Sequence, residues 1–278
     1  MNLAEAVQNP QLFVRKAVGR LRRRTVRMPD GTLLAQMEGG VRFELKRLSF
    51  LEEDDIRAMM TQSYDITLCD CFRKHLSPGR IVLDVGANIG YMSAVAASCV
   101  GPTGEVHGFE PLAECFERLQ NLSRLNPEFR LFFHNTAIGA QKGTLSIGFN
   151  PEGDMRNATL VPGKKAPQNR EVPVWRLDDY IEEKIASPER IAMIKVDVEG
   201  FEFSVLQGLE RFLATSKHRP LIVCEVKPWE IKNLGYTMQD FDRFMKRFGY
   251  GTFEMVRETK SVDLTSMIDM DTVLFRPI

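Results

Sequence analysis

The stretch from Ile81 to Tyr91 constrains the fold of this 278-residue chain more than any other. A continuous apolar run ends in an acid, and a tight Gly-x-Asn-x-Gly turn and a run of small residues follow it. Such an apolar run is typical of a strand buried on both faces, as in a parallel sheet. Gly86 and Gly90 would let the backbone turn sharply and approach a ligand, and the turn opens onto a helix N-terminus that favours an electron-rich partner. The segment is predicted to be a nucleotide-binding strand–turn–helix unit.

Two details of this turn indicate which nucleotide it binds. The dinucleotide fingerprint G-x-G-x-x-G is incomplete, because Asn88 replaces the middle glycine and Tyr91 the last one. Asp84 ends the strand, and a carboxylate there would repel phosphate but suit a cationic amino-acid group. S-adenosylmethionine carries an ammonium and a sulfonium and no phosphate. The turn therefore favours S-adenosylmethionine over a nicotinamide dinucleotide.

A second apolar strand, Val106 to Phe109, ends in Glu110-Pro111, twenty residues after Gly90. A carboxylate at this spacing typically binds a ribose diol. Glu110 suits both cofactors, so the choice between them depends on Asp84 and Asn88. The remaining alternative is an ordinary strand–turn–helix whose glycines are accidental, and Glu110 argues against it.

Strands and helices alternate from Ser77 onward, which predicts a parallel α/β sheet. The expected strands are 81–85, 106–110, 130–134, 191–197 and 221–226, and the expected helices lie near 91–100, 113–125, 201–213 and 238–248. Two further strands, 251–256 and 272–275, are expected to pair as a C-terminal antiparallel hairpin. This pattern predicts a class I Rossmann-like methyltransferase fold with a mostly parallel seven-stranded sheet.

Residues 1–75 are expected to form a small N-terminal α/β extension, and residues 76–278 the main domain. The first fifty residues hold ten Lys and Arg against four acids. A basic amphipathic helix is predicted from Leu12 to Arg27, followed by a hairpin with strands 32–37 and 41–45 around Glu38-Gly39-Gly40. The helix either packs at the domain edge or contacts an anionic lipid, glycan or nucleic acid.

The segment between the third and fourth core strands breaks the alternation. Strand-like residues 143–149 and 172–177 flank a polar loop, 150–170, that contains Arg156, Asn157 and Thr159. A loop of this length inside a compact domain is more often functional than idle. It is interpreted as a substrate lid, the alternative being a plain surface loop.

Charged residues cluster where the last two core strands end. Lys195, Asp197 and Glu199 alternate along the fourth strand, and Glu225 ends the fifth, just before Lys227. In open α/β sheets ligands bind at this edge, and charges there are costly unless they are paired or used. Asp197, Glu199 and Glu225 are therefore the candidate catalytic residues, one of them as general base.

Three other interpretations of this cluster remain open. The charges could neutralise each other, for example Lys195 with Glu225. The carboxylates could bind Mg²⁺, although no fixed metal-ligand spacing supports a metal site. His134, at the end of the third strand, is a weaker candidate base and could instead line an adenine pocket.

The composition of the chain limits which partners and which cellular compartment are expected. The chain has 37 basic and 37 acidic residues, and no basic stripe with interleaved aromatic residues, so a nucleic-acid acceptor is not expected. Its five cysteines lack zinc-finger spacing and are expected to be free thiols in a reducing compartment. The absence of a long apolar run and of a signal-peptide core predicts a cytoplasmic protein. The oligomeric state is not predicted.

Four motifs resemble those of the FkbM-type family of S-adenosylmethionine-dependent O-methyltransferases. They are Val-Leu-Asp-Val-Gly-Ala-Asn-Ile-Gly-Tyr at 82–91, Gly-Phe-Glu-Pro at 108–111, Leu-Asp-Asp-Tyr at 177–180 and Ile-Lys-Val-Asp-Val-Glu-Gly at 194–200. The resemblance covers roughly residues 64–226. The first motif is common to many methyltransferases, and its combination with Lys-x-Asp-x-Glu-Gly is much more specific.

The resemblance implies methylation of a hydroxyl on a sugar, glycolipid or natural product. It places Asp197 beside the methionine end of the cofactor, Glu199 near the acceptor, and Asn135 and Ala137 near the adenine. The predicted cofactor-binding residues are Asp84, Gly86, Ala87, Asn88, Gly90, Tyr91, Glu110, Pro111, Asn135, Ala137 and Asp197. The alternatives are a non-catalytic S-adenosylmethionine-binding module and a nicotinamide-dependent oxidoreductase.

Overall fold

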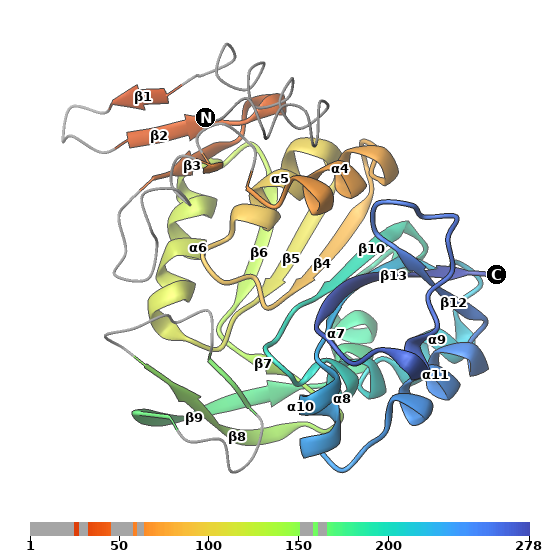
Figure 1. Ribbon diagram of the computed structural model, residues 1–278. Helices are drawn as coiled ribbons and strands as arrows, with labels where there is room; N and C mark the ends of the chain where they lie inside the picture. Colours follow the sequence, from red (N-terminus) through yellow and green to blue (C-terminus); the bar gives the residue numbers. More distant parts are fainter. Residues whose placement is uncertain (1–24, 28–32, 46–57, 60–63, 151–157, 161–165) are drawn as a thin grey trace, which may run out of the picture.

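The computed structural model describes residues 25–27, 33–45, 58–59, 64–150, 158–160 and 166–278 (Figure 1). Its centre is a seven-stranded sheet in the order β12-β13-β11-β10-β4-β5-β6. The strands are β4 (Ile81–Val85), β5 (Glu105–Phe109), β6 (Arg130–His134), β10 (Ile191–Val196), β11 (Leu221–Val226), β12 (Tyr250–Glu254) and β13 (Asp271–Pro277).

Five neighbouring strands of this sheet, β11, β10, β4, β5 and β6, run parallel to one another. The strand β13 pairs antiparallel with both β11 and β12. The predicted class I Rossmann-like fold is confirmed, including the C-terminal hairpin. All five residues of β4 are buried, Asp84 included, as expected for a mainly apolar strand at the centre of a sheet.

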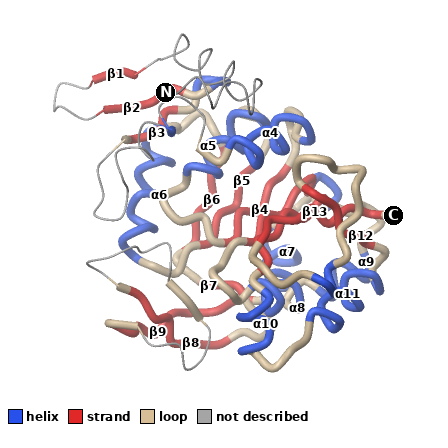
Figure 2. Tube along the Cα trace, viewed as in Figure 1, coloured by secondary structure: helices blue, strands red, loops and turns tan. Residues whose placement is uncertain are grey.

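Helices cover both faces of the sheet (Figure 2). One face carries α4 (Ile66–His75), α5 (Tyr91–Val100) and α6 (Ala113–Leu125). The other carries α7 (Leu177–Lys184), α8 (Glu202–Gln207), α9 (Glu210–Thr215), α10 (Pro228–Asn233) and α11 (Met238–Arg247). Side chains alternate between the layers, so Val82 packs under the first group and Leu83 under the second.

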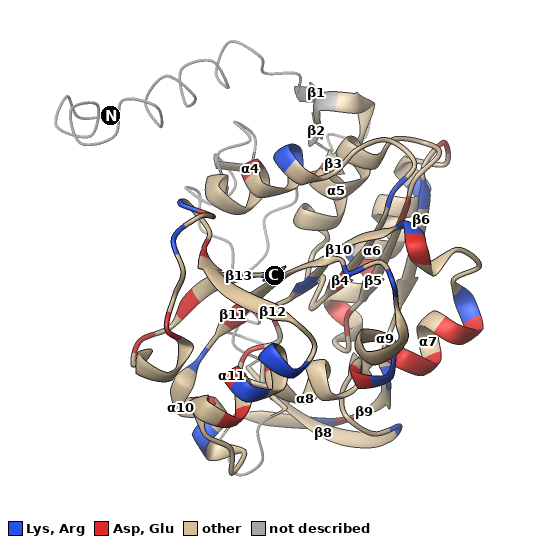
Figure 3. Ribbon diagram, turned by 90° about the vertical axis from the view of Figure 1, so that its right-hand side faces the viewer, with Lys and Arg blue, Asp and Glu red and all other residues tan. Residues whose placement is uncertain are grey.

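The outer helices carry acids and bases side by side, as α7 and α11 illustrate in Figure 3. Lys246 pairs with Asp242 within α11 at 2.7 Å, and Arg211 of α9 pairs with Asp179 of α7 at 2.8 Å. None of the described helices is both long and apolar enough to cross a lipid bilayer. The five cysteines are free, as predicted.

The predicted helix 201–213 is two helices, α8 and α9, that meet at Gly208. A Cβ atom at this glycine would lie 2.2 Å from the carbonyl oxygen of Gly139. The chain therefore passes too close to the strand β7 (Ala137–Ile138) and its following turn for a side chain here. The break between α8 and α9 is capped from α7. The carbonyl oxygen of Gly208 accepts the N–H of Asp178, and the Asp178 carboxylate accepts the N–H groups of Arg211 and Phe212, long-range bonds that local periodicity does not reveal.

The predicted N-terminal hairpin is present as β2 (Leu33–Gln36) and β3 (Arg42–Glu44), joined by a short 3₁₀ turn (Glu38–Gly40). A third strand, β1 (Thr25–Arg27), pairs with β2, so the end of the predicted basic helix is a strand. The rest of that helix lies outside the described residues. Phe43 packs edge-on against Tyr91 of α5, with ring centroids 5.6 Å apart. The hairpin thus shares the apolar core of the main domain.

The segment between the third and fourth core strands forms a separate small sheet. Its strands β8 (Gly143–Phe149) and β9 (Gln168–Trp175) are antiparallel, and β7 pairs in parallel with β9. Thr159, in the connection between β8 and β9, bridges back to Gly148.

Two glycines of the first motif are required by packing within the protein. Gly86 has φ 80°, and a Cβ there would lie 1.8 Å from the carbonyl oxygen of Asp197. Gly90, the N-cap of α5, has φ 86°, and a Cβ there would lie 2.7 Å from a methyl carbon of Leu119. These glycines thus allow close approach to the residue after β10 and to α6, and Gly86 also lines the cavity described below.

We expect Gly86→Ala to lower the free energy of unfolding by at least about 2 kcal/mol, because it adds left-handed backbone strain and a backbone collision. Urea denaturation of the purified protein measures this change. The matched control is Gly143→Ala, since a Cβ at Gly143 has no atom within 4 Å. Equal stability of the two variants would contradict the packing argument.

Candidate functional site

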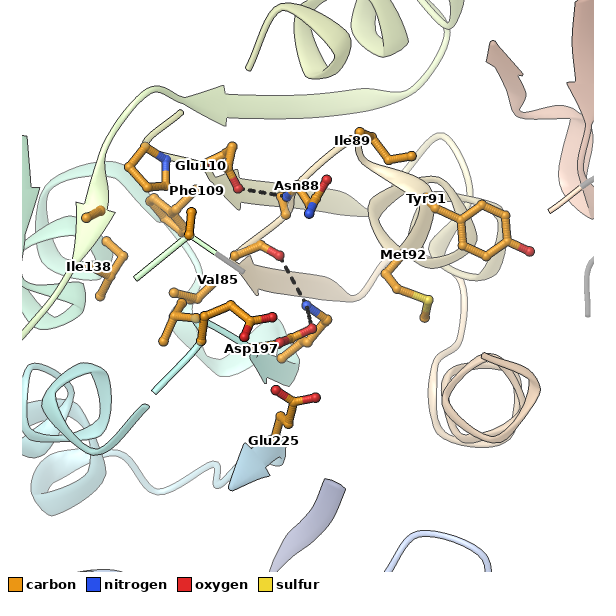
Figure 4. Close-up of a pocket in the computed structure, with 18 of the residues that line it drawn as sticks. Val85, Asn88, Ile89, Tyr91, Met92, Phe109, Glu110, Ile138, Asp197 and Glu225 are labelled. Atoms are coloured by element: carbon orange, nitrogen blue, oxygen red, sulfur yellow. Dashed lines mark hydrogen bonds and ion pairs between the residues drawn. The ribbon is translucent and has the colours of Figure 1, made fainter. Parts of the chain in front are cut away.

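A cavity of about 300 Å³ lies at the carboxyl ends of the central strands, where parallel α/β sheets bind ligands. Figure 4 shows Val85, Phe109 and Ile138 grouped near Glu110, while Asp197 and Glu225 lie together at neighbouring strand ends. The predicted residues that line it are Gly86, Ala87, Asn88, Tyr91, Glu110, Pro111, Ala137, Asp197, Glu199 and Glu225.

Glu110 is held rigidly at the apolar end of the cavity. Its Oε2 accepts the N–H of Asn88 and its Oε1 the N–H of Leu112, each at 2.9 Å. Burial raises the pKa of Glu110 to about 7, although these two hydrogen bonds favour the carboxylate. A carboxylate oxygen has more than one acceptor site, so both oxygens can still accept a hydroxyl.

Three predicted cofactor residues do not line the cavity. Asn135 donates to the carbonyl oxygens of Glu110 and Pro111, both at 2.9 Å, and so holds the turn after β5. Gly90 is covered by α6, and Asp84 is fully buried beneath the turn. All three residues therefore contact the protein itself at the turns after β4 and β5.

Asp84 belongs to a buried charge network around Lys195. The Lys195 ammonium lies 3.5 Å from Asp84, 3.1 Å from Asp197 and 3.2 Å from the carbonyl oxygen of Gly86. Ser93 donates to the other oxygen of Asp84 at 2.5 Å. Burial alone would lower the pKa of Lys195, but the carboxylates of Asp197 and Asp84 outweigh it and the net shift is upward. Lys195 thus stays charged and joins β4, the first turn and the end of β10.

The charges at the strand ends do pair with one another, but the expected pair of Lys195 with Glu225 is wrong. Lys195 pairs with Asp84 and Asp197, while Lys227 pairs with Glu199 and, at 2.7 Å, with Glu225. Burial would lower the pKa of Lys227, but the two glutamates raise it above its usual value. The cluster is therefore partly neutralised by an ammonium group of the chain itself.

Glu199 and Glu225 both have an unusual protonation equilibrium. Burial raises the pKa of Glu199 to about 7, against the opposing effect of Lys227. Burial, and then the charge of Asp197, raise the pKa of Glu225. A carboxyl group that titrates near neutral pH and faces a cavity can take up and release a proton during a reaction.

Glu199 also has a strained backbone, with φ 59° in the left-handed region. The fully buried Glu202 accepts the N–H groups on either side of it, from Val198 at 3.1 Å and from Gly200 at 2.9 Å. Thr159 donates its hydroxyl to the carbonyl oxygen of Glu199 at 3.1 Å. Strained residues persist where their surroundings hold them in place, and here three hydrogen bonds do so.

Sequence analysis missed Glu202, and it missed the wall that α4 and the preceding residues contribute. The position of Glu202 at the expected start of a helix could have indicated its role, because an acid there can accept N–H groups of the preceding turn. Tyr64, Asp65 and Leu68 line the cavity, although they lie inside the predicted extension. No local pattern marks them, because they reach the cavity only through packing of α4 on α5.

Two other expectations concern His134 and the loop 150–170. His134 forms a hydrogen bond with Tyr180 at 2.7 Å and stacks on Phe109. It does not line the cavity. Ala158 and Leu160 of the loop do line it, which agrees with the lid interpretation. Arg156 and Asn157 lie outside the described residues.

Among the described residues, one oxygen from each of Asp197, Glu199 and Glu225 lies within 4.8 Å of the other two. Three such oxygens could bind a divalent cation. The ammonium of Lys227 already contacts two of the three carboxylates, so the protein supplies a positive charge at this place.

Comparison with known proteins gives consistent matches. Residues 84–251, more than half of the chain, match the family model described as methyltransferase FkbM domain. The 31-O-demethyl-FK506 methyltransferase FkbM of Streptomyces tacrolimicus is 30% identical over 67% of this chain and 75% of its own length. Methyltransferase 1 of Beauveria bassiana is 28% identical over 46% of this chain, a match that spans 58% of that relative.

Among solved structures, the methyltransferase FkbM of Methylobacillus flagellatus KT aligns with 82% of this chain and 56% of its own. The sequence identity is 17% and the TM-score is 0.46.

We expect Glu202→Ala to lower the free energy of unfolding by about 2 to 5 kcal/mol, because two buried N–H groups lose their acceptor. Thermal and urea unfolding measure the loss. The matched control is Glu182→Ala, which removes a largely exposed carboxylate of α7 and should stay within about 0.5 kcal/mol of the parent. A Glu202→Ala protein as stable as this control would show that the turn does not need the carboxylate.

Proposed function

Because this chain belongs to the FkbM methyltransferase family, we propose that it is an S-adenosylmethionine-dependent O-methyltransferase. Its acceptor would be a hydroxyl group of a sugar, glycolipid or natural product. The observation that carries the proposal is that Glu110, a carboxylate suited to a diol, and Glu199, a carboxyl group with a near-neutral pKa, open onto one cavity. The Streptomyces relative is named for an O-demethyl compound, which favours oxygen as the accepting atom.

The donor groups of the cavity suit S-adenosylmethionine. Glu110 would accept the two ribose hydroxyls, and the apolar surface of Phe109, Pro111 and Ile138 would hold the adenine. Asp197 and the turn at Asn88 would face the cationic amino-acid end. When bound, S-adenosylmethionine supplies an electrophilic methyl group on its sulfonium. The proposed direct contacts are Gly86, Ala87, Asn88, Tyr91, Glu110, Pro111, Ala137 and Asp197.

Glu199 is assigned as the general base. An alcohol loses its proton only with difficulty in water, so a base must stand beside the acceptor oxygen as the new bond forms. With a pKa of about 7, Glu199 is partly ionised at neutral pH and can accept that proton. The clamp formed by Glu202 and Thr159 would keep its carboxylate in one position. Such positioning contributes to the rate as much as basicity does.

Lys227 and Glu225 are assigned to tuning this base. Lys227 contacts both glutamates, so it stabilises the charged form of Glu199 that accepts the proton. Glu225 shares that ammonium and adds negative charge, which raises the pKa of Glu199. Burial is the main cause of the raised pKa of Glu199, Lys227 opposes it, and Asp197 and Glu225 add to it.

We assign residues 1–75 as an accessory cover and residues 76–278 as the catalytic domain. Tyr64 and Asp65 support the cover, because they line the cavity from outside the family match. Ala158 and Leu160 support a lid in the β8–β9 connection. Cover and lid together would exclude water from the acceptor once both ligands are bound.

Calorimetric titration with S-adenosylhomocysteine tests the cofactor, with NAD as the parallel ligand. We expect binding of the former alone, and we expect Glu110→Gln to weaken it at least about tenfold, because a charged acceptor of two hydroxyls is lost. The matched control, Glu117→Gln, changes an exposed carboxylate of α6 and should bind like the parent. Binding of NAD alone would refute the proposed cofactor.

We expect turnover to rise with pH through about 7 and to level off above it. Glu199 must be ionised to accept a proton, and its pKa is raised to about 7, so the active form is lost as pH falls through that value. At saturating S-adenosylmethionine, where ionisation of Glu110 does not limit the rate, Glu199→Gln should lose this pH dependence and lower turnover at least about tenfold, while it retains S-adenosylhomocysteine binding. Methyl-transfer assays on hydroxylated acceptors measure both effects.

Two outcomes of this experiment would contradict the assignment. Unchanged turnover in Glu199→Gln would remove Glu199 from the mechanism. Cofactor binding without methyl transfer to any hydroxylated acceptor would favour a non-catalytic binding module. Glu117→Gln again serves as the control, because it makes the same change at an exposed residue that does not line the cavity.

A further inference from the structure

A second group of metal-binding side chains lies away from the cavity. Cys71 and His75 are four residues apart on α4, which places them on the same face of the helix. Glu258, in the connection between β12 and β13, reaches the same place from the other end of the chain. One donor atom from each of the three lies within 4.8 Å of the others, among the residues that the structure describes.

The three groups are enclosed but still reachable from solvent. Cys71 is 2% exposed, while the side chains of His75 and Glu258 are 24% and 10% exposed. His75 Nε2 lies 2.8 Å from Glu258 Oε2, so two of the donors already meet. A partly buried carboxylate beside an imidazole and a thiol is a costly arrangement unless the groups are paired or used.

Besides His75, Lys74 contacts this carboxylate, with its Nζ 2.6 Å from Glu258 Oε2. Its side chain is 61% exposed. An exposed lysine on a flexible stem gains little from such a pair and can turn to water at small cost. A cation with stronger bonds could therefore replace it without a change in the backbone.

The donor set selects the kind of metal. Thiolate, imidazole and carboxylate together suit Zn²⁺, whereas Mg²⁺ and Ca²⁺ prefer oxygen ligands alone. Zinc bonds of about 2.0 to 2.3 Å put tetrahedral donors roughly 3.5 Å apart. The three donor atoms lie within 4.8 Å of one another, close enough for one ion to contact all of them, and the 24% exposure of the His75 side chain would let water reach a fourth position.

We propose that Cys71, His75 and Glu258 form a Zn²⁺ site that is separate from the methyl-transfer cavity. The bound ion would link α4 to the β12–β13 connection. The first turn of α4, with Asp65 and Leu68, lines the cavity. The metal would thus fasten the helix that forms one of the cavity walls.

The experiment uses the full chain after removal of metals with a chelator, titrated with Zn²⁺ and, separately, with Co²⁺ as the coloured substitute. We expect about one equivalent of Zn²⁺ to bind and Co²⁺ to give a thiolate-to-metal charge-transfer band. Cys71→Ser should abolish the band and weaken Zn²⁺ binding at least about tenfold. Loss of a residue that only hydrogen-bonds to a metal ligand already weakens metal binding by that factor. The control Cys99→Ser, which changes a half-buried cysteine of α5, should bind like the parent.

Two results would overturn the site. One is the absence of a charge-transfer band in the parent protein. The other is Zn²⁺ binding that Cys71→Ser leaves unchanged, which would place the ion at Asp197, Glu199 and Glu225 instead. If Cys71→Ser does not fold, His75→Ala keeps the thiol and should also weaken Zn²⁺ binding at least about tenfold. Because the titration uses metal alone, its result does not depend on the methyl-transfer activity.

Discussion

The buried ammonium of Lys195 is the interaction on which the arrangement of the cavity depends. It contacts Asp84 at the end of β4, the carbonyl oxygen of Gly86 in the first turn, and Asp197 beyond β10. A buried charge is tolerated only with such partners, and loss of one partner leaves the others destabilised. The first turn, whose Asn88 N–H binds Glu110, is therefore fixed against the end of β10, just before Glu199.

The acids of this region divide into two groups by what they contact. Asp84 and Glu202 are fully buried and bind groups of the protein, a lysine in one case and two backbone N–H groups in the other. Glu110 and Glu199 reach the cavity, and burial raises the pKa of both to about 7. In the proposed mechanism the first group holds the site in shape and the second contacts the cofactor and the acceptor.

The sequence predicted the sheet well, because strands buried on both faces leave an unmistakable apolar run. It placed β4, β6 and β11 at their observed bounds, and the C-terminal hairpin in its observed pairing. It failed where distant segments decide the local structure. The helix 201–213 divides near Gly208, where Asp178 of α7 bonds to both sides of the break, and the α4 wall of the cavity exists only through packing on α5.

The sequence by itself determined which charged residues reach the carboxyl edge of the sheet, because strand order along the chain and the period of two suffice for that. Only the tertiary structure decided their partners. Lys195 lies opposite Asp84 in the register of β10 with β4, so it binds that carboxylate and leaves Glu225 to Lys227. Register between strands far apart in the chain arises from packing of the whole sheet, and no local pattern specifies it.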